Sequence, residues 1–259
     1  MTLTEIRAAL ESRGLRPLKQ LGQNFLHDRN LAAWLAGRCV EGLPPDAQVV
    51  EIGPGLGSLT ARLLEKDVRL VAIEKDRGLA TFLREKFADE IARGRFELRE
   101  GDALELLPAL GFAPAAVCGN LPYNISTPLL MECLRLPPAP LFFVMQKEVG
   151  QRLASPPGGK IYGALSVLVQ TAYRVELERT LPGSVFHPPP EVESAAIRLT
   201  PLPKPPVAPQ DRADFMAFVQ RGFSQRRKKL SNLLPTTDSR RAEHLSPAEW
   251  VGLWASCQR

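Results

Sequence analysis

The sequence has few of the features that would place the protein in a membrane, outside the cell or around a metal ion. A membrane span needs about 18 consecutive apolar residues, and no apolar run in the sequence approaches this length. Residues 1–15 form an amphipathic helical pattern rather than a signal peptide. The four cysteines are scattered without a Cys-x-x-Cys pair, and the three histidines show no ligand spacing. We therefore expect a cytoplasmic protein with reduced thiols, no membrane association and no metal site.

The composition is that of an ordinary globular protein with a modest basic excess. The chain has 259 residues, enough for one large domain and a small appendage, with 44% hydrophobic and 24% charged residues. Residues 183–259 carry 11 Lys and Arg against 7 Asp and Glu, which accounts for most of the net charge of +5. This distribution permits a polyanionic partner but does not require one.

Strand-like and helix-like segments alternate through the first part of the chain. Helical patterns over 59–67, 78–94 and 126–136 separate short apolar runs that read as strands at 48–53, 69–74, 95–100, 115–120 and 141–146. This alternation predicts an α/β fold with a mostly parallel, doubly wound sheet. We expect a helix followed by a strand within 159–181, and a late strand at an edge of the sheet over 194–202.

A proline-rich segment marks the expected domain boundary. Residues 201–210 contain five prolines and read as a stiff linker, followed by helical patterns over 214–234 and 246–256. We therefore predict a catalytic domain over 1–202 and a small helical domain over 203–259. Because so short a segment rarely forms a core alone, we expect it to dock on the larger domain.

A glycine-rich turn follows the first of the predicted parallel strands. Gly53, Gly55 and Gly57 have the spacing G-x-G-x-G, and Ser58 stands where a dinucleotide fingerprint would have Gly or Ala. Glycines at such a turn let a ligand approach the backbone closely. Alone, the motif is also compatible with a purely structural turn.

Polar side chains stand at the ends of the next three strands. These are Glu74, Asp102 and Asn120, and ligands of open α/β sheets bind at the carboxyl ends of strands. An acidic residue at the second strand suits the two hydroxyls of a ribose, although Asp102 could instead only cap the helix that follows it. The set matches S-adenosyl-L-methionine better than NAD, because we find no residues for hydride transfer.

The motifs together resemble the ribosomal RNA adenine N6,N6-dimethyltransferase family, from about residue 16 to about residue 250. They are GQNFL (22–26), EIGPGLGSLT (51–60), AIEKD (72–76), GDAL (101–104), GNLPYNISTPL (119–129), MQKEV (145–149), YGALSV (162–167), FHPPPEVESA (186–195) and FSQRRKKLSNLL (223–234). The resemblance is strongest to the bacterial enzymes that dimethylate two adjacent adenines near the 3′ end of small-subunit ribosomal RNA. It implies a Rossmann-like S-adenosylmethionine-dependent methyltransferase, acting as a monomer in the cytoplasm on RNA in a pre-30S particle.

The resemblance also assigns roles to individual residues. The residues expected to contact S-adenosylmethionine are Asn24, Leu26, Gly53, Glu74, Asp102 and Asn120. Tyr123 and Phe186 are expected to hold the target adenine, while Asn120 and the carbonyl of Leu121 accept hydrogen bonds from its N6 amine. Pro122 keeps Leu121 extended. The basic cluster at the end of a predicted helix, Arg226, Arg227, Lys228 and Lys229, is expected to contact RNA, although it also suits a helix C-terminus and solubility.

Three other functions remain open at this point. A related large-subunit methyltransferase that confers macrolide resistance shares the chemistry but usually has Ile where Leu121 stands. A non-catalytic RNA-binding assembly factor could use the same fold, although Glu74, Asp102 and the NLPY motif are intact. A dehydrogenase is disfavoured by Ser58. After residue 234 the family usually has more helix, so we expect a C-terminal domain that is shortened by about one helix, which affects its RNA contacts more than its catalysis.

Overall fold

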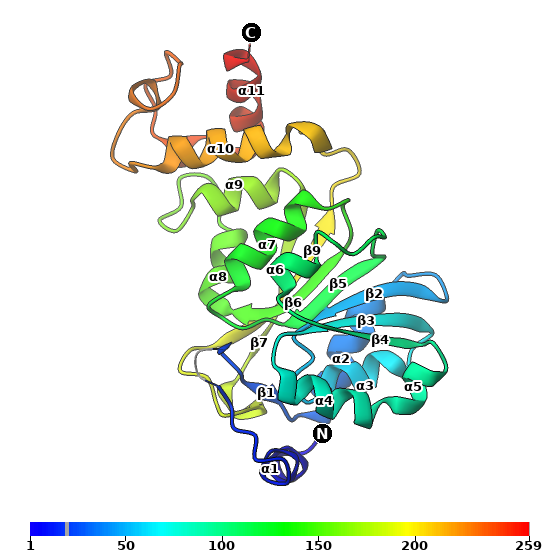
Figure 1. Ribbon diagram of the computed structural model, residues 1–259. Helices are drawn as coiled ribbons and strands as arrows, with labels where there is room; N and C mark the ends of the chain where they lie inside the picture. Colours follow the sequence, from blue (N-terminus) through cyan, green and yellow to red (C-terminus); the bar gives the residue numbers. More distant parts are fainter. Residues whose placement is uncertain (19–20, 259) are drawn as a thin grey trace. The chain divides into compact units, whose positions relative to one another are not determined.

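The computed structural model describes residues 1–18 and 21–258, which group into two compact units (Figure 1). Unit 1 comprises Met1–Lys147 and Glu178–Arg198, and unit 2 comprises Glu148–Leu177 and Leu199–Arg259. No helix among the described residues is long and apolar enough to span a membrane. Each unit is described in turn.

A seven-stranded sheet with the order β4-β3-β2-β5-β6-β9-β7 is the central element of the fold. Its strands are β2 (Ala47–Ile52), β3 (Val68–Glu74), β4 (Phe96–Glu100), β5 (Ala116–Asn120), β6 (Leu141–Gln146), β7 (Tyr173–Leu181) and β9 (Ser194–Pro201). The pairs β2–β3, β3–β4, β2–β5 and β5–β6 are parallel. The expected doubly wound arrangement is therefore present, with the strand order reversing between β2 and β5.

Both faces of β2, β3, β5 and β6 are buried, as their apolar runs indicate, whereas only Phe96 of the edge strand β4 is buried. One face carries alternate residues such as Val49, Leu70 and Cys118, which pack with the apolar side chains of α2 (Arg29–Val40) and α3 (Ser58–Leu64). The other helices of this unit are α1 (Leu3–Glu11), α4 (Arg77–Lys86), α5 (Ala88–Ala92), α6 (Ala103–Leu106) and α7 (Ser126–Arg135). A separate two-stranded ribbon pairs β1 (Phe25–Leu26) with β8 (Phe186–His187) antiparallel.

Unit 2 is mainly helical. Its helices include α9 (Ala164–Gln170), α10 (Arg212–Phe223) and α11 (Pro247–Cys257), and α8 (Lys147–Leu153) begins at the boundary between the units. Trp250 of α11 is fully buried and stacks on Phe223, and the Tyr162 hydroxyl donates a hydrogen bond of 2.9 Å to the carbonyl of Leu245. The residues before β7 thus supply part of the core around which the C-terminal helices pack.

The structure differs from the sequence-based expectations in three places. Residues 148–177 group with the C-terminal helices, whereas we expected one boundary at residue 202. A 57-residue segment lacks the apolar surface for its own core, and no proline-rich linker marks residue 148. Strand β9 lies between β6 and β7, so the expectation of an edge strand is wrong. Helix α10 ends at Phe223 rather than continuing to residue 234.

Candidate active site

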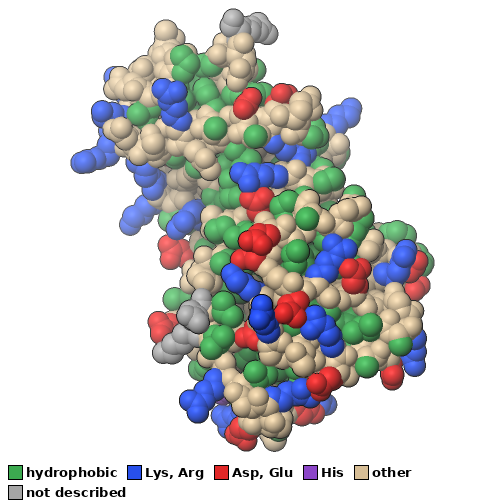
Figure 2. Space-filling view, in the orientation of Figure 1, with side chains coloured by type: hydrophobic (Ala, Val, Ile, Leu, Met, Phe, Trp, Pro, Cys, Tyr) green, Lys and Arg blue, Asp and Glu red, His purple; other side chains and the backbone are tan. Residues whose placement is uncertain are grey.

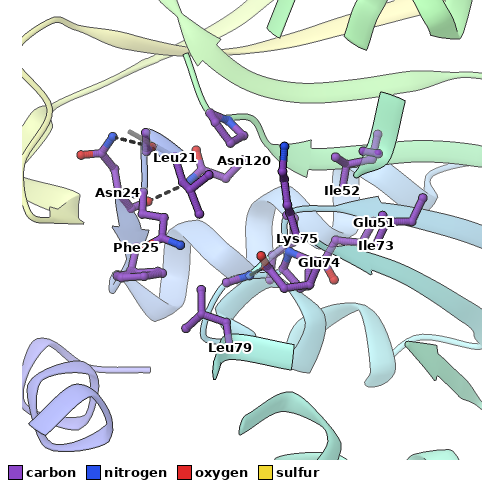
Figure 3. A pocket seen from close by; sticks show the side chains of 18 of the residues that line it. Leu21, Asn24, Phe25, Glu51, Ile52, Ile73, Glu74, Lys75, Leu79 and Asn120 are labelled. Atoms are coloured by element: carbon purple, nitrogen blue, oxygen red, sulfur yellow. Dashed lines mark hydrogen bonds between the residues drawn. The ribbon is translucent and has the colours of Figure 1, made fainter. Parts of the chain in front are cut away.

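A pocket lies at the carboxyl ends of β2, β3 and β5, beside the point where the strand order reverses. Gly119 allows β5 to approach β2 there, because a Cβ atom at this position would lie 2.3 Å from the carbonyl oxygen of Ile52. The pocket lies wholly within unit 1. All six residues predicted to contact a cofactor line it, namely Asn24, Leu26, Gly53, Glu74, Asp102 and Asn120. Asn24, Glu74 and Asn120 are labelled in Figure 3.

The glycine-rich turn at the pocket needs its glycines for conformation. Gly53, Gly55 and Gly57 have φ angles of +65°, +59° and +75°, in the left-handed region that side chains disfavour. The backbone N–H of Gly55 donates a hydrogen bond of 3.0 Å to Oε2 of Glu74. Ser58 follows the turn, and its Oγ atom is buried without a hydrogen-bond partner among the described residues.

Glu74 is a buried carboxylate at the end of β3. Its Oε1 accepts a hydrogen bond of 2.9 Å from the N–H of Asp76, and its side chain is fixed from both sides by backbone donors. Burial raises the pKa of Glu74, and the two backbone hydrogen bonds oppose that rise. Each carboxylate oxygen has a second lone pair, so the group can still accept hydrogen bonds from a ligand in the pocket.

Asp102 is placed both to cap a helix and to contact a ligand, the two roles considered from the sequence. Its Oδ1 accepts a hydrogen bond of 2.9 Å from the N–H of Leu104 and thereby caps α6, while the residue also lines the pocket. Lys75, which follows Glu74 directly, places Nζ 2.6 Å from Oδ2 of Asp102. The Lys75 hydrogen bond holds the pKa of Asp102 below its ordinary value.

Asn120 and Asn24 meet across 96 residues of sequence. Nδ2 of Asn120 donates a hydrogen bond of 2.8 Å to the backbone carbonyl of Asn24 (Figure 3). Because a carbonyl can only accept, this contact fixes which end of the amide is the donor. Oδ1 of Asn120 therefore points the other way as an acceptor, and no described residue donates a hydrogen bond to it.

The segment 22–26 lies directly against the segment 119–126. A Cβ atom at Gly22 would lie 3.2 Å from Oδ1 of Asn124 and 3.4 Å from the backbone nitrogen of Tyr123. Leu121 is 1% exposed, so its side chain belongs to the core and only its backbone is open to a functional role. Tyr123 is half-buried, and its hydroxyl is hydrogen-bonded to Oγ of Ser194.

Three residues predicted to contact the target adenine, Leu121, Tyr123 and Phe186, do not line the pocket in this structure. Tyr123 lies beside it, next to Pro122 and Asn124, which do line it. Phe186 is 3% exposed and packs in the core with Leu26, its partner in the ribbon of β1 and β8. Their role toward a target base stays a prediction.

The sequence reasoning missed Glu51, a pocket residue of β2 that is 1% exposed. Burial raises its pKa to about 8, although the hydroxyl of Thr60 donates a hydrogen bond of 2.7 Å to it. Its carboxyl group is thus mostly protonated at neutral pH. The sequence shows an acidic residue two positions before Gly53, but acidic residues at a strand end are usually exposed to solvent. Nothing in the sequence showed that this side chain is buried.

The basic cluster 226–229 lies in unit 2, in a turn that follows α10. Arg226 is engaged within the unit, because Nη2 donates to the carbonyls of Lys160 and Tyr162 at 3.0 and 3.2 Å and also pairs with Glu243. Residues 227–229 are exposed, and Lys229 forms a β-bridge with Arg241. On the face shown in Figure 2, basic and acidic side chains are interspersed over unit 1, whereas basic ones predominate over unit 2. The RNA contacts of all four residues stay a prediction.

Among residues 1–18 and 21–258, no three His, Cys, Asp or Glu side chains are grouped as a metal ion would require. Cys39, Cys118 and Cys133 are buried free thiols, as expected, and Cys257 is partly buried.

Comparison with known proteins gives a consistent result. A family model described as ribosomal RNA adenine dimethylase matches residues 15–249. The chain is 43% identical to ribosomal RNA small subunit methyltransferase A of Geobacter metallireducens, over 87% of this chain and 82% of the relative. It is 40% identical to the Synechococcus protein of the same name, over 92% and 91%.

Solved structures share the fold at lower identity. A dimethyladenosine transferase of Plasmodium falciparum is 19% identical, with a TM-score of 0.71 and coverage of 88% of this chain and 95% of that one. The 23S rRNA methyltransferase ErmE is 23% identical, with a TM-score of 0.68 and coverage of 91% and 100%. These likenesses show a Rossmann-like methyltransferase fold.

Proposed function

Because this chain belongs to the ribosomal RNA adenine dimethylase family, we propose that it methylates N6 of two adjacent adenines near the 3′ end of small-subunit ribosomal RNA. The family makes it an S-adenosylmethionine-dependent methyltransferase of ribosomal RNA adenines. The relatives at 40% identity or more that cover most of the chain carry a small-subunit name, which favours that RNA over the large subunit.

The pocket fits S-adenosylmethionine at two points. Glu74 retains lone pairs for the two ribose hydroxyls, and the left-handed glycine turn brings backbone close to a ligand without side chains in between. The unpartnered Oγ of Ser58, beside that turn, would be satisfied by a polar group of the cofactor's amino-acid end. Asn24, Leu26 and Asp102 complete the proposed cofactor wall.

The observation that carries the proposed mechanism is the fixed orientation of the Asn120 amide. The N6 amine of adenine is a poor nucleophile, because its lone pair is delocalised into the ring. Oδ1 of Asn120 and the carbonyl of Leu121 would accept its two hydrogens and so favour tetrahedral geometry at the nitrogen. Asn24 keeps Oδ1 in the acceptor position before substrate arrives, so no reorganisation is needed during the reaction.

S-adenosylmethionine supplies the methyl group on a positively charged sulfur. The N6–C bond forms as the S–C bond breaks, and the methylated amine loses a proton to water, so the site requires no general base. Stacking of Tyr123, and contact with Phe186, would fix the plane of the base. The hydrogen bond between Tyr123 and Ser194 restrains the ring from its far end, which supports this role. Orientation of this kind can supply about 7–11 kcal/mol of the barrier.

The remaining parts of the proposal concern partner and location. The exposed residues 227–229 would contact RNA phosphates, and the substrate would be RNA in a pre-30S particle. We further propose that the protein acts as a monomer in the cytoplasm. The division of labour between unit 1, which would perform catalysis, and the C-terminal helices, which would contact RNA, belongs to the same proposal.

Single-turnover methyl transfer by Asn120→Ala tests the mechanism. The rate should fall by at least about 100-fold, the scale for losing one preorganised hydrogen bond at a reacting group. RNA affinity and the melting temperature should change little, because Asn120 is a partly exposed residue at the end of its strand. Asn30→Ala on α2, which removes an exposed amide, is the matched control.

A rate near that of the wild type in Asn120→Ala would refute the acceptor role. Mass spectrometry of small-subunit RNA from a strain lacking the protein tests the substrate. Loss of dimethyladenine from that RNA is expected, whereas intact modification there would refute the assignment and return the large subunit as the candidate.

A further inference from the structure

Three successive residues of the glycine-rich turn, 55–57, are in close contact with neighbouring side chains. A Cβ atom at Gly55 would lie 3.0 Å from the ring of Phe25, and one at Gly57 would lie 2.6 Å from the ring of Phe87. Between them, the carbonyl oxygen of Leu56 accepts a hydrogen bond of 2.7 Å from Nζ of Lys86. Phe25 of β1 also lines the pocket, whereas Lys86 and Phe87, at the end of α4, contact the turn without lining the pocket.

Lys86 occupies an unusual place for a lysine. Its Nζ lies 5.5 Å from the ring centroid of Phe82 and 5.0 Å from that of Phe87, and it forms no salt bridge with a described residue. Although the residue as a whole is exposed, desolvation of the ammonium group lowers its pKa to about 8. The hydrogen bond to the backbone carbonyl of Leu56 partly compensates the desolvation of the Lys86 ammonium group.

The contact restrains the peptide plane between Leu56 and Gly57 through its carbonyl oxygen. Leu56 stands between two glycines, which tolerate either orientation of the intervening peptide groups. A flip would turn the Leu56 carbonyl away from Lys86 and break the hydrogen bond of 2.8 Å from the N–H of Gly57 to the carbonyl of Pro54. The hydrogen bond from Lys86 and the hydrogen bond from Gly57 to Pro54 thus both hold the observed orientation.

Helix α1 completes this arrangement, although it lies before the residues 15–249 that the family model matches. Ile6 and Leu10 of α1 form one buried cluster with Phe25, Leu56 and Leu79, and these three side chains line the pocket. The helix is fixed by the Thr2–Glu5 capping box and by ion pairs of Glu5 with Arg29 and of Arg13 with Glu85.

We propose that Lys86 and α1 form a brace that holds the turn 55–57 in the conformation competent to bind the cofactor, with Lys86 as a positioning residue. The cofactor contacts the pocket side of the turn and the brace contacts the other side, so the coupling is mechanical rather than a direct contact. The proposal relies on the cofactor site proposed above. It predicts that loss of the brace weakens cofactor binding and leaves the catalytic step nearly unchanged.

Calorimetry of S-adenosylmethionine binding to Lys86→Met tests the brace. Methionine keeps the length of the side chain and removes its donors, so Kd and KM for the cofactor should rise about tenfold, the scale for a hydrogen bond from a charged group. The kcat at saturating cofactor, and RNA affinity, should stay within twofold of the wild type. Lys86→Arg should restore most of the affinity, and Lys66→Met, at an exposed lysine after α3, should change nothing.

A variant lacking residues 2–11 tests α1 separately and serves if Lys86→Met does not fold. It should also bind the cofactor several-fold more weakly while remaining folded, and wild-type affinity in this variant would overturn the role of α1. A Kd within twofold of the wild type in folded Lys86→Met would overturn the brace. Glu74→Ala distinguishes the proposed brace from the proposed cofactor site. Weaker cofactor binding in Glu74→Ala but not in Lys86→Met would refute only the brace. Unchanged cofactor binding in both variants would refute the cofactor site itself.

Discussion

Replacing Glu74 by alanine is the most direct test of where the cofactor binds. The substitution removes a carboxylate that is 6% exposed and whose two oxygens already accept hydrogen bonds from Gly55 and Asp76. In the proposed complex the same oxygens also accept the two ribose hydroxyls. The variant therefore loses ligand contacts and the restraint on the N–H of Gly55 at the same time.

The magnitude follows from the kind of hydrogen bond that is lost. A hydrogen bond to a charged group contributes about 1.5–3 kcal/mol, and water entering the space left by the side chain would replace part of a second one. We therefore expect binding to weaken by about 1.5–3 kcal/mol, or about 10- to 150-fold in Kd. The fold should be less affected, because removing a buried carboxylate also removes the cost of burying it.

Calorimetry with S-adenosylmethionine and, separately, with NAD measures this effect. Glu97→Ala, at an exposed glutamate of the neighbouring strand β4, is the control and should bind as the wild type does. NAD should show no tight binding to any of the three proteins, because Ser58 stands where the dinucleotide fingerprint has the small residue that completes its pyrophosphate-binding turn. An unchanged Kd in folded Glu74→Ala, or tight binding of NAD, would refute the reasoning.

Two further predictions concern RNA binding and pH. Replacing residues 227–229 by Gln should flatten the slope of log RNA affinity against log salt concentration by about two, without changing which adenines are modified. Arg226→Gln should hardly alter this slope, because the Arg226 side chain is engaged within unit 2. An unchanged slope in the triple variant would show that residues 227–229 form a solvated turn without RNA contacts. For Glu51, the folded-state pKa of about 8 lies above the ordinary value of 4.5, so the folded state retains the proton longer and stability is lost as pH rises through this interval. The stability of Glu51→Gln relative to the wild type should therefore increase between about pH 4.5 and pH 8, by at most about 1.4 kcal/mol per pH unit. Chemical denaturation of both proteins at several pH values measures this difference. Curves of unfolding free energy against pH that run parallel for the two proteins would contradict a buried neutral carboxyl group at Glu51.

The sheet of unit 1 could be predicted because its signals are local. Five short strand-like runs gave five parallel strands within one or two residues of their observed limits, and the runs end at Gly53, Glu74, Glu100, Asn120 and Gln146. The strand ends then identified the pocket, because parallel strands share one carboxyl edge. The roles of Glu74 and Asn120 needed the family resemblance as well, since a strand-end acid or amide alone is also compatible with a cap or a turn.

What could not be predicted depends on contacts between distant segments. The membership of 148–177 in unit 2 rests on contacts such as that of Tyr162 with Leu245, which no local pattern reveals. The engagement of Arg226 has the same origin, because its acceptors lie more than 60 residues away. The burial of Glu51 and the contact of Lys86 with Leu56 likewise depend on how helices cover the sheet.

The interleaving of the two units along the chain limits how the protein could be dissected or recombined. Unit 1 needs Glu178–Arg198, which brings Ser194 to Tyr123, so a fragment ending at residue 147 would lose that hydrogen bond and the strand that pairs with β1. A fragment ending at Arg198 would keep unit 1 but strip α9 of the helices that bury its apolar face. A homologous C-terminal region could therefore be exchanged only by replacing two separate stretches of the gene together, as a matched pair.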